Sequence, residues 1–314
     1  MNQDVINCPQ CARRTPAGRG ACIYCGETLP ITNLGTAPPQ RKIESFELAF
    51  NTVLEPSNPR MRESAVAALA AALQIEPGEA ESFIAAAKPA PVARTHTRQE
   101  AEMIALLVRS CGLGASVVAD EDLHIETELI RARRIERGES ELQVHHTAGV
   151  MAVPVAEIRL FVMGALREIR IDYTEGSTGL RGQPGNVLDT SEFRSDEILI
   201  DVYTSSLDKS FRIKSDAFDY SGLVWPLSFR AEVNFQSAIA ALRAAAPQAT
   251  FDNDFTRMRN LLSHAWPERT RNEAQGIKRT GLAYRPVAKS SVTSDNRDQF
   301  ERYSRLMFLY AAAS

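Results

Sequence analysis

The chain has 314 residues, of which 44% are hydrophobic and 24% charged, with a formal net charge of −3. This composition is typical of a soluble globular protein of two or three domains. The longest apolar runs, such as residues 65–73, are shorter than the roughly 20 residues that cross a bilayer, so no transmembrane segment is predicted.

The first residues have neither the basic start nor the apolar core of a secretory signal. We therefore expect a cytoplasmic location, where thiols stay reduced. The sequence pI of about 6.0 gives no global field that would gather polyanions, so a nucleic acid could bind only through a local basic patch.

Four cysteines near the start of the chain carry the strongest chemical signal. They follow the pattern C-x2-C, ten residues, C-x2-C, and they are Cys8, Cys11, Cys22 and Cys25. In a reducing compartment this spacing favours Zn²⁺ over disulfides. A thioredoxin-like redox pair would use one CxxC and leave the second unexplained. Four sulfurs fill every coordination position, so we expect a structural and not a catalytic metal.

The stretch "CPQCARRTPAGRGACIYCG" resembles the short zinc ribbons that begin many bacterial proteins. The resemblance implies zinc and an interaction role, and it names no partner. It departs from the pattern at Ala12, where glycine commonly follows the first cysteine pair. Three arginines could offset the charge of the four thiolates: Arg13, Arg14 and Arg19. We assign residues 1–29 to this ribbon and the proline-rich residues 30–43 to a linker.

Residues 44–120 predict a small module with the order β-α-α-β-α-β. An alternating strand with Phe46, Leu48 and Phe50 begins it, and a helix capped at Asn58 and a second helix from Pro77 follow. A proline-containing strand near 89–95 suits a sheet edge. Thr97 and Glu100 form a capping box before a third helix, whose apolar face we expect to bury Cys111 as an inert thiol, and "SVVA" is the last strand.

The run from "AAAKPAPV" to "RQEAE" and "GLGASVV" resembles the C-terminal domain of the bacterial ribosomal stalk protein, a fold shared with ClpS-type adaptors. The resemblance implies a protein-docking module. The stalk domain docks translation factors through a lysine-rich helical face, but only Lys88 is present here, so that activity does not carry over.

From about residue 129 the apolar period changes to two, which predicts six or seven short strands. The first two form a hairpin at "RGES", and residues 175–193 are expected to be a mobile surface loop. A helix with a single apolar stripe follows, made of Phe235, Ile239, Leu242 and Ala246. We predict a small antiparallel β-barrel closed by that helix over 121–249, which resembles a pleckstrin-homology-like barrel.

The chain contains no G-x-S-x-G, P-loop, G-x-G-x-x-G or H-E-x-x-H motif, and we predict no catalytic residue. Asp120, Glu121 and Asp122 are interpreted as solvated charge in a connector. His145 and His146 point to opposite faces of a strand and cannot share a metal. We interpret His264 as a residue at a helix end.

Residues 250–314 predict a helical C-terminal extension. A helix ending before Pro267 is followed by a polar connector over 268–289, and a last helix starts near Ser294 or Asp295. That helix could pack on its own domain or enter a partner's groove. Its apolar side is formed by Phe300, Tyr303, Met307 and Tyr310.

The fold class that follows is a multidomain α+β protein. Our leading hypothesis for its function is a non-enzymatic, zinc-binding interaction or adaptor protein that docks protein partners. An alternative is a nucleic-acid-associated protein, and another is an enzyme with an unrecognised site in the β-rich domain. The nucleic-acid alternative would use the ribbon and the basic segment 269–289, through Arg13, Arg14, Arg19, Arg269, Arg271, Lys278, Arg279 and Arg285.

Overall fold

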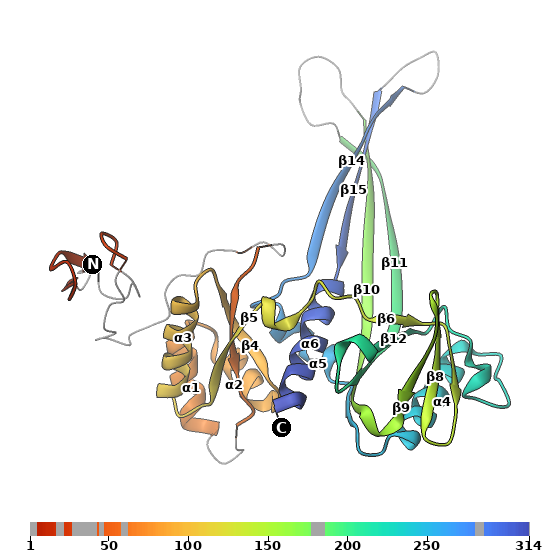
Figure 1. Ribbon diagram of the computed structural model, residues 1–314. Coiled ribbons are helices and arrows are strands. Elements are labelled where there is room, and N and C mark those ends of the chain that lie inside the picture. The colour runs from red at the N-terminus through yellow and green to blue at the C-terminus, as the bar shows by residue number, and fades with distance from the viewer. Residues whose placement is uncertain are drawn as a thin grey trace. The chain divides into compact units, whose positions relative to one another are not determined.

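The computed structural model describes residues 5–16, 22–26, 43, 47–57, 62–176, 186–279 and 286–313 (Figure 1). These residues form a mixed α/β structure with six α-helices and several sheets. The chain divides into two compact units. Unit 1 comprises 1–127, 257–267 and 305–313, and unit 2 comprises 128–256 and 268–304, with Ser314 grouped in unit 2. The five segment boundaries predicted above stay predictions.

The module predicted over 44–120 has the expected order of elements within unit 1. Its three strands form an antiparallel sheet in the order β4-β3-β5, so the proline-containing strand is an edge strand, as expected. The elements are β3 (Phe50–Leu54), α1 (Arg62–Leu73), α2 (Pro77–Ala86), β4 (Ala90–Thr95), α3 (Arg98–Ser110) and β5 (Ala115–Ala119).

Local sequence signals explain most of this module. The Thr97–Glu100 capping box forms at the start of α3, and Ala101, Ile104 and Val108 are fully buried on one helical face. The first strand, however, was predicted too early. The described strand starts at Phe50, and Leu48 before it is 64% exposed. The buried residues of the strand are the consecutive run "NTVL" (51–54), and the alternating segment before Phe50 is not part of it. Phe46 and Asn58 lie outside the described residues.

Unit 2 contains a seven-stranded sheet and a three-stranded sheet. The larger sheet has the order β14-β15-β10-β11-β12-β6, with β13 paired to β10, and the smaller has the order β7-β8-β9. The strands of the smaller sheet are β7 (Arg134–Arg137), β8 (Glu141–His146) and β9 (Gly149–Pro154). Those of the larger sheet are β6 (Ile130–Ala132), β10 (Ile158–Gly176), β11 (Asn186–Thr204), β12 (Phe211–Lys214), β13 (Thr250–Asp252), β14 (Arg269–Arg279) and β15 (Pro286–Asp295).

The pairings of the described strands do not close the predicted antiparallel barrel. The larger sheet ends at β14 and at β6, and two of its pairings, β12 with β6 and β10 with β13, are parallel. The closing helix was predicted correctly as an element. It is α4 (Ala231–Ala245), and its predicted stripe joins one core with apolar residues of both sheets, among them Ile135, Leu142, Phe161 and Phe211.

Two long hairpins, β10–β11 and β14–β15, pair side by side into a four-stranded arm within unit 2. In Figure 1 these strands rise together, and β10 pairs with β15 from Glu168–Asp295 to Gly176–Val287. The arm overturns two expectations. Residues 186–193 of the predicted mobile loop belong to β11, and most of the predicted connector 268–289 belongs to β14 and β15; residues 177–185 and 280–285 lie outside the described ranges.

The C-terminal region contains the two predicted helices, α5 (Phe255–Leu262) and α6 (Arg297–Ala313), with the second hairpin between them. Both helices of the predicted extension are therefore present, and its predicted connector is wrong because most of that segment forms β-strands. In unit 2, Phe300 and Tyr303 of α6 are fully buried and contact the ring of Phe255 at centroid distances of 5.0 and 5.6 Å. This part of α6 packs on its own unit, which answers the question that the sequence left open. The helix starts at Arg297, two residues later than the later of the two expected starts.

Gly164 of β10 lies directly against the ring of Phe300, and a Cβ atom at this position would overlap that ring. We expect Gly164→Ala to destabilise unit 2 by about 1–3 kcal/mol, since overpacking forces side chains and backbone to shift. Denaturant unfolding measures the loss of stability, and hydrogen exchange in β10 shows where it occurs. The double variant Gly164→Ala, Phe300→Leu should recover part of the loss; equal costs with and without the smaller partner would contradict the explanation.

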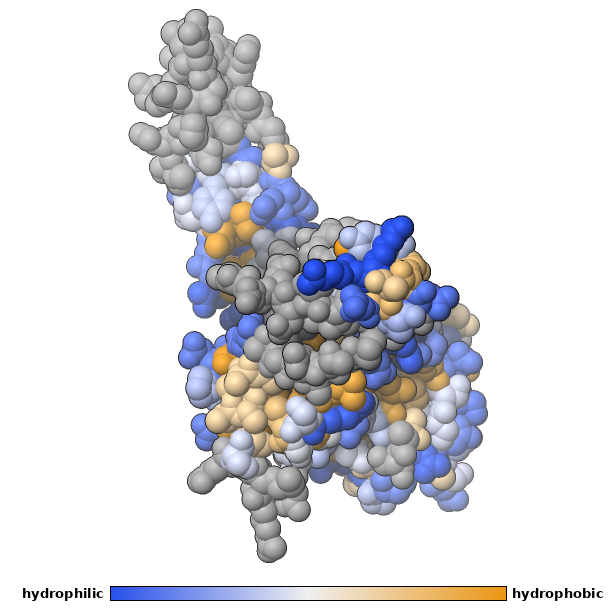
Figure 2. All heavy atoms as spheres, turned by 90° about the vertical axis from the view of Figure 1, so that its left-hand side faces the viewer, coloured by the Kyte–Doolittle hydropathy of each residue, from blue (hydrophilic) through white to orange (hydrophobic). Residues whose placement is uncertain are grey.

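The described helices include none with both the length and the apolar character needed to cross a lipid bilayer. On the face drawn in Figure 2, hydrophilic and hydrophobic side chains are interspersed over the coloured surface. Apolar side chains at the surface are ordinary, because a folded protein has too little polar surface to cover itself completely.

Candidate metal centre

The first cysteine pair lies in the turn of a short hairpin. Strands β1 (Val5–Asn7) and β2 (Arg14–Pro16) are antiparallel, and Cys8 N–H donates to the carbonyl of Arg13 at 3.0 Å. Ala12 N–H donates to the carbonyl of Cys8 at 2.9 Å, and Ala12 has a φ of 55°. The turn therefore needs a left-handed residue directly after Cys11, which explains why ribbons commonly place glycine there.

The second cysteine pair repeats this turn. Gly26 N–H donates to the carbonyl of Cys22 at 2.9 Å, and Gly26 has a φ of 74°. Tyr24 N–H donates to the sulfur of Cys22 at 3.4 Å. Each pair is thus held by a tight turn that directs two sulfurs to one side, as the C-x2-C spacing predicts.

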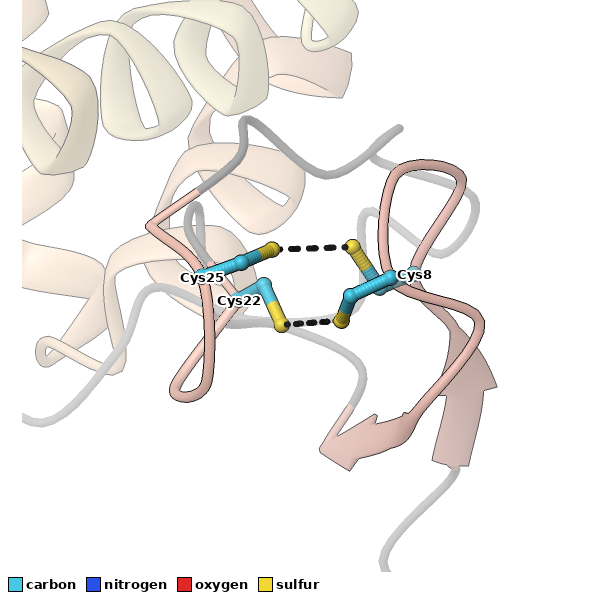
Figure 3. A group of neighbouring side chains, drawn as sticks. Cys8, Cys22 and Cys25 are labelled. Atoms are coloured by element: carbon cyan, nitrogen blue, oxygen red, sulfur yellow. Dashed lines mark hydrogen bonds between the residues drawn. The ribbon is translucent and has the colours of Figure 1, made fainter.

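The four sulfurs converge between the two turns (Figure 3). Cys8 and Cys25 approach to 3.5 Å between Sγ atoms, Cys11 and Cys22 to 3.6 Å, and all four Sγ atoms lie within 4.8 Å of one another. Metal–sulfur bonds of about 2.3 Å in a tetrahedral site would place the sulfurs about 3.8 Å apart. The contacts are too long for disulfides, whose S–S bond is about 2.05 Å. The cluster can therefore hold a tetrahedral metal ion.

The local electrostatics favour a thiolate at Cys22. Burial of the sulfur acts to raise its pKa, but N–H groups of Tyr24 and Cys25 and the thiols of Cys11 and Cys25 outweigh it, and the pKa of Cys22 falls to about 7. Hydrogen bonds to the charged form stabilise that form. Since the thiolate is the metal-binding form, these backbone donors prepare the cluster for a cation.

Ala12 carries a conformational cost that glycine would avoid. We expect Ala12→Gly to tighten metal binding about fivefold, because an L-residue in the left-handed region costs roughly 1 kcal/mol and metal binding drives the folding of the ribbon. The converse variant is Gly26→Ala. No atom of the described residues lies within 4 Å of the added Cβ, so the expected effect is on the backbone conformation. This variant should weaken binding by a similar factor. Chelator competition measures both affinities, and equal affinities for the two variants would contradict the prediction.

The residues of the nucleic-acid alternative fall into two groups. In the ribbon, Arg13 and Arg14 are exposed, and the guanidinium of Arg13 lies 5.1 Å from the ring centre of Tyr24. In the arm, Arg269 and Arg271 are exposed and, two residues apart, share one face of β14. The backbone of Lys278 and Arg279 continues β14, and Arg19 and Arg285 lie outside the described residues.

The interpretation of Asp120 as solvated charge is wrong. The residue is 1% exposed, and its carboxylate accepts hydrogen bonds from Arg94 at 2.5 Å, Asn51 at 2.8 Å and the backbone N–H of Ala49 at 3.1 Å. Trp266 Nε1 in turn donates to Asn51 at 2.8 Å. This buried network holds together segments of unit 1 that are far apart in sequence. The sequence contained a weak signal for it, since Arg94 is the one charged residue of the edge strand β4.

Two other singled-out side chains have structural surroundings. Cys111 is only partly buried, contrary to the prediction; its thiol donates to the carbonyl of Leu107 at 3.3 Å, and burial raises its pKa, which opposes a role as nucleophile. His264 follows the end of α5, as predicted. Its ring lies 5.4 Å from that of Phe83, and its Nε2 lies 3.5 Å from a carboxylate oxygen of Glu79.

A depression on the arm brings ionisable groups together, which the sequence did not predict. It has a volume of about 240 Å³. Arg170 Nε lies 2.8 Å from Asp172 and Arg194 Nε lies 2.7 Å from Glu192, so its arginines are neutralised by acids two residues away on the same strand. It is lined by Glu168, Arg170, Asp172, Phe193, Arg194 and Ser195.

The comparisons with known proteins add no family to this description. No family model matches the chain, and no curated protein and no solved structure is significantly similar to it.

Proposed function

We propose that the chain is a cytoplasmic, non-enzymatic protein whose N-terminal ribbon binds structural Zn²⁺ and docks a protein partner. The convergence of four cysteine sulfurs within 4.8 Å of one another carries the proposal. Zinc is the metal that four thiolates with this spacing favour, and such a site leaves no position for water or substrate. The ion would therefore organise the ribbon and take no part in a reaction.

The surface of the ribbon supports the docking role. Ile23 and Tyr24, which lie between Cys22 and Cys25, are 51% and 54% exposed, and Arg13 lies over the ring of Tyr24 at 5.1 Å. Tyrosine and arginine are enriched at the centres of protein interfaces, where they bury much surface at a low entropic cost. A segment that a metal ion cross-links, and that leaves such side chains exposed to solvent, is suited to bind a partner through them.

A protein partner is favoured over nucleic acid because the side chains described on the arm do not form a basic stripe. Arg269 pairs across the strands with Asp295 and lies 3.8 Å from Asp298, and the exposed Glu273 follows on the same face of β14. Alternating charges cancel at the distances over which a polyanion is attracted. Binding that weakens steeply with salt and depends on Arg13 and Arg14 would favour nucleic acid instead.

An enzyme with a site in the β-rich domain is the remaining alternative. It requires a pocket where ionisable groups face a substrate. In the depression on the arm, Arg170 and Arg194 each face an acid of their own strand, and this arrangement favours a stabilising role for these charges.

Partner capture from native extract tests the proposal. The wild-type chain is compared with Ile23→Ser, Tyr24→Ser, which alters the ribbon surface and leaves the cysteines in place. Leu106→Ser, at a 40% exposed position of α3, is the matched control. A specific protein should be retained by the wild type and the control and lost with the double variant. If it stays bound to the double variant and to a chain without the ribbon, the docking role is wrong.

A further inference from the structure

Exposed apolar side chains gather just before and at the start of α4 in unit 2. Trp225 is 86% exposed and Phe229 is 111% exposed, while Leu227 and Val233 are 43% and 45% exposed. We call residues 225–233 the apolar knob. Four of the ten large hydrophobic side chains that are exposed among the described residues fall in this segment. Monomeric proteins rarely leave large contiguous apolar surface in water unless it serves binding.

A pocket lies at the C-terminal end of the same helix. It is shallow, with a volume of about 410 Å³, it surrounds the last turn of α4, and its lining is small and apolar apart from one arginine. Large side chains from another molecule could enter this pocket, because the methyl groups of its alanines occupy little space. We call this the alanine pocket, and its lining residues are Ala240, Arg243, Ala244, Ala246, Pro247 and Ala249.

The knob and the pocket are joined by one side of α4. Val233, Ser237, Ala240 and Ala244 are spaced by four, three and four residues, which places them on one helical face. None of the four is fully buried, and three are exposed. This face, which we call the track, therefore carries small side chains after Val233. The aromatic residues of the apolar knob lie before its start, and the alanine pocket lies at its end.

We propose that this face is the interface of a two-fold dimer, in which α4 packs antiparallel against α4 of a second copy. An antiparallel arrangement sets the start of each helix beside the end of the other. Each knob then meets the alanine pocket of the partner, and both contacts form at once. The same surface serves both copies, so the assembly closes at two chains. The opposed helix dipoles also attract in this arrangement.

The charges on α4 complement one another in this arrangement. Glu232 and Arg243 are both exposed and lie eleven positions apart. Because a helix turns about 100° per residue, such positions point within about 20° of the same direction. A two-fold axis near the middle of α4 therefore brings Glu232 of one copy close to Arg243 of the other, twice. A parallel pairing would bring like charges together.

The exposed apolar area matches what a second copy must cover. An aromatic side chain can bury about 150–250 Å² of surface. The highly exposed Trp225 and Phe229 therefore offer roughly 300–500 Å² of surface for burial on each copy. A stable interface buries about 800 Å² on each partner. The two aromatic residues thus provide about half of it, and the track along α4 is the surface available for the rest.

Sedimentation velocity of the full chain over a range of concentrations tests the dimer. The wild type should form dimers, whereas Phe229→Ser and Ala244→Arg, which alter the knob and the pocket separately, should each weaken association by about 30-fold or more. Both positions are exposed, so folding should be retained. Phe193→Ser removes an aromatic residue that is 57% exposed on the arm, and it should leave the dimer unchanged.

Two further readouts make the test specific. The chain has two tryptophans, and Trp266 is 2% exposed, so a blue shift of the emission on association would report Trp225 entering the interface. Arg243→Glu should weaken the dimer several-fold, and Glu232→Arg, Arg243→Glu together should restore it. A chain that stays monomeric at all concentrations overturns the proposal. So does a dimer that tolerates Phe229→Ser, or a knob that binds lipid vesicles while the chain remains monomeric.

Discussion

Replacing Cys8 with serine is expected to lower the zinc content of the purified protein from one ion per chain to near zero. Three sulfurs cannot close the tetrahedron that the four Sγ atoms outline, and the segment is too small to fold on apolar burial alone. Binding of the metal supplies about 10 kcal/mol or more of folding free energy in sites of this kind. We therefore expect hydrogen exchange to accelerate strongly in residues 5–16 and 22–26.

The fifth cysteine provides the matched control for this experiment. Cys111 lies at the end of α3 and outside the four-sulfur cluster, so Cys111→Ser should keep one zinc per chain. A strong chelator should reproduce the exchange pattern of Cys8→Ser in the wild-type chain. Wild-type protein that carries no metal, or equal metal loss in both serine variants, would show that the cluster is not a zinc site.

Removing the carboxylate of Asp201 should destabilise unit 2 by about 3 kcal/mol, the low end of the range for a broken buried pair, because it leaves the largely buried guanidinium of Arg212 with only the partly exposed Glu301 as a counter-charge. Asp201 of β11 is fully buried and pairs with Arg212 of β12 through two hydrogen bonds of 2.6 and 2.9 Å. Burial acts to lower the pKa of Arg212, but Asp201 and Glu301 outweigh it and raise that pKa. Ser304 of α6 also donates to Asp201 at 2.6 Å, so one carboxylate links two strands and a helix.

Denaturant unfolding of Asp201→Leu, with hydrogen exchange in β11, β12 and α6, measures this effect. Asp208→Ala, at an exposed position of the same unit, should change stability by less than about 0.5 kcal/mol. The double variant Asp201→Leu, Arg212→Met should recover part of the loss, since it removes the unpaired charge but still leaves Ser304 without its acceptor. A single variant that costs less than about 1 kcal/mol would refute the importance of this pair.

Prediction from the sequence succeeded where local rules decide the structure. The C-x2-C spacing, the Thr97–Glu100 capping box and the helical stripe of α4 each depend on residues a few positions apart, and each is present as expected. These features are set by short-range sterics and hydrogen bonds that any chain with the same pattern would share.

The second hairpin of the arm, β14–β15, could not be predicted because its strands bury little on either face. Segments such as "RTRNEAQGIKR" of β14 carry no alternation of apolar and polar residues, since a thin arm has solvent on both sides. Strand β14 forms by pairing with β15 of the same hairpin, and β15 in turn pairs with β10, which lies far earlier in the chain. Asp120 was misinterpreted for a related reason: the arginine and the asparagine that bury it lie 26 and 69 residues away.

The division of unit 1 among residues 1–127, 257–267 and 305–313 has a consequence for biosynthesis. A ribosome releases the chain from its N-terminus, so the first segment emerges long before the pieces that complete its unit. Trp266, whose side chain donates a hydrogen bond to Asn51 inside that unit, is made only after most of unit 2. Part of the interior of the nascent α/β module therefore stays uncovered until residues 257–267 and 305–313 have been synthesised.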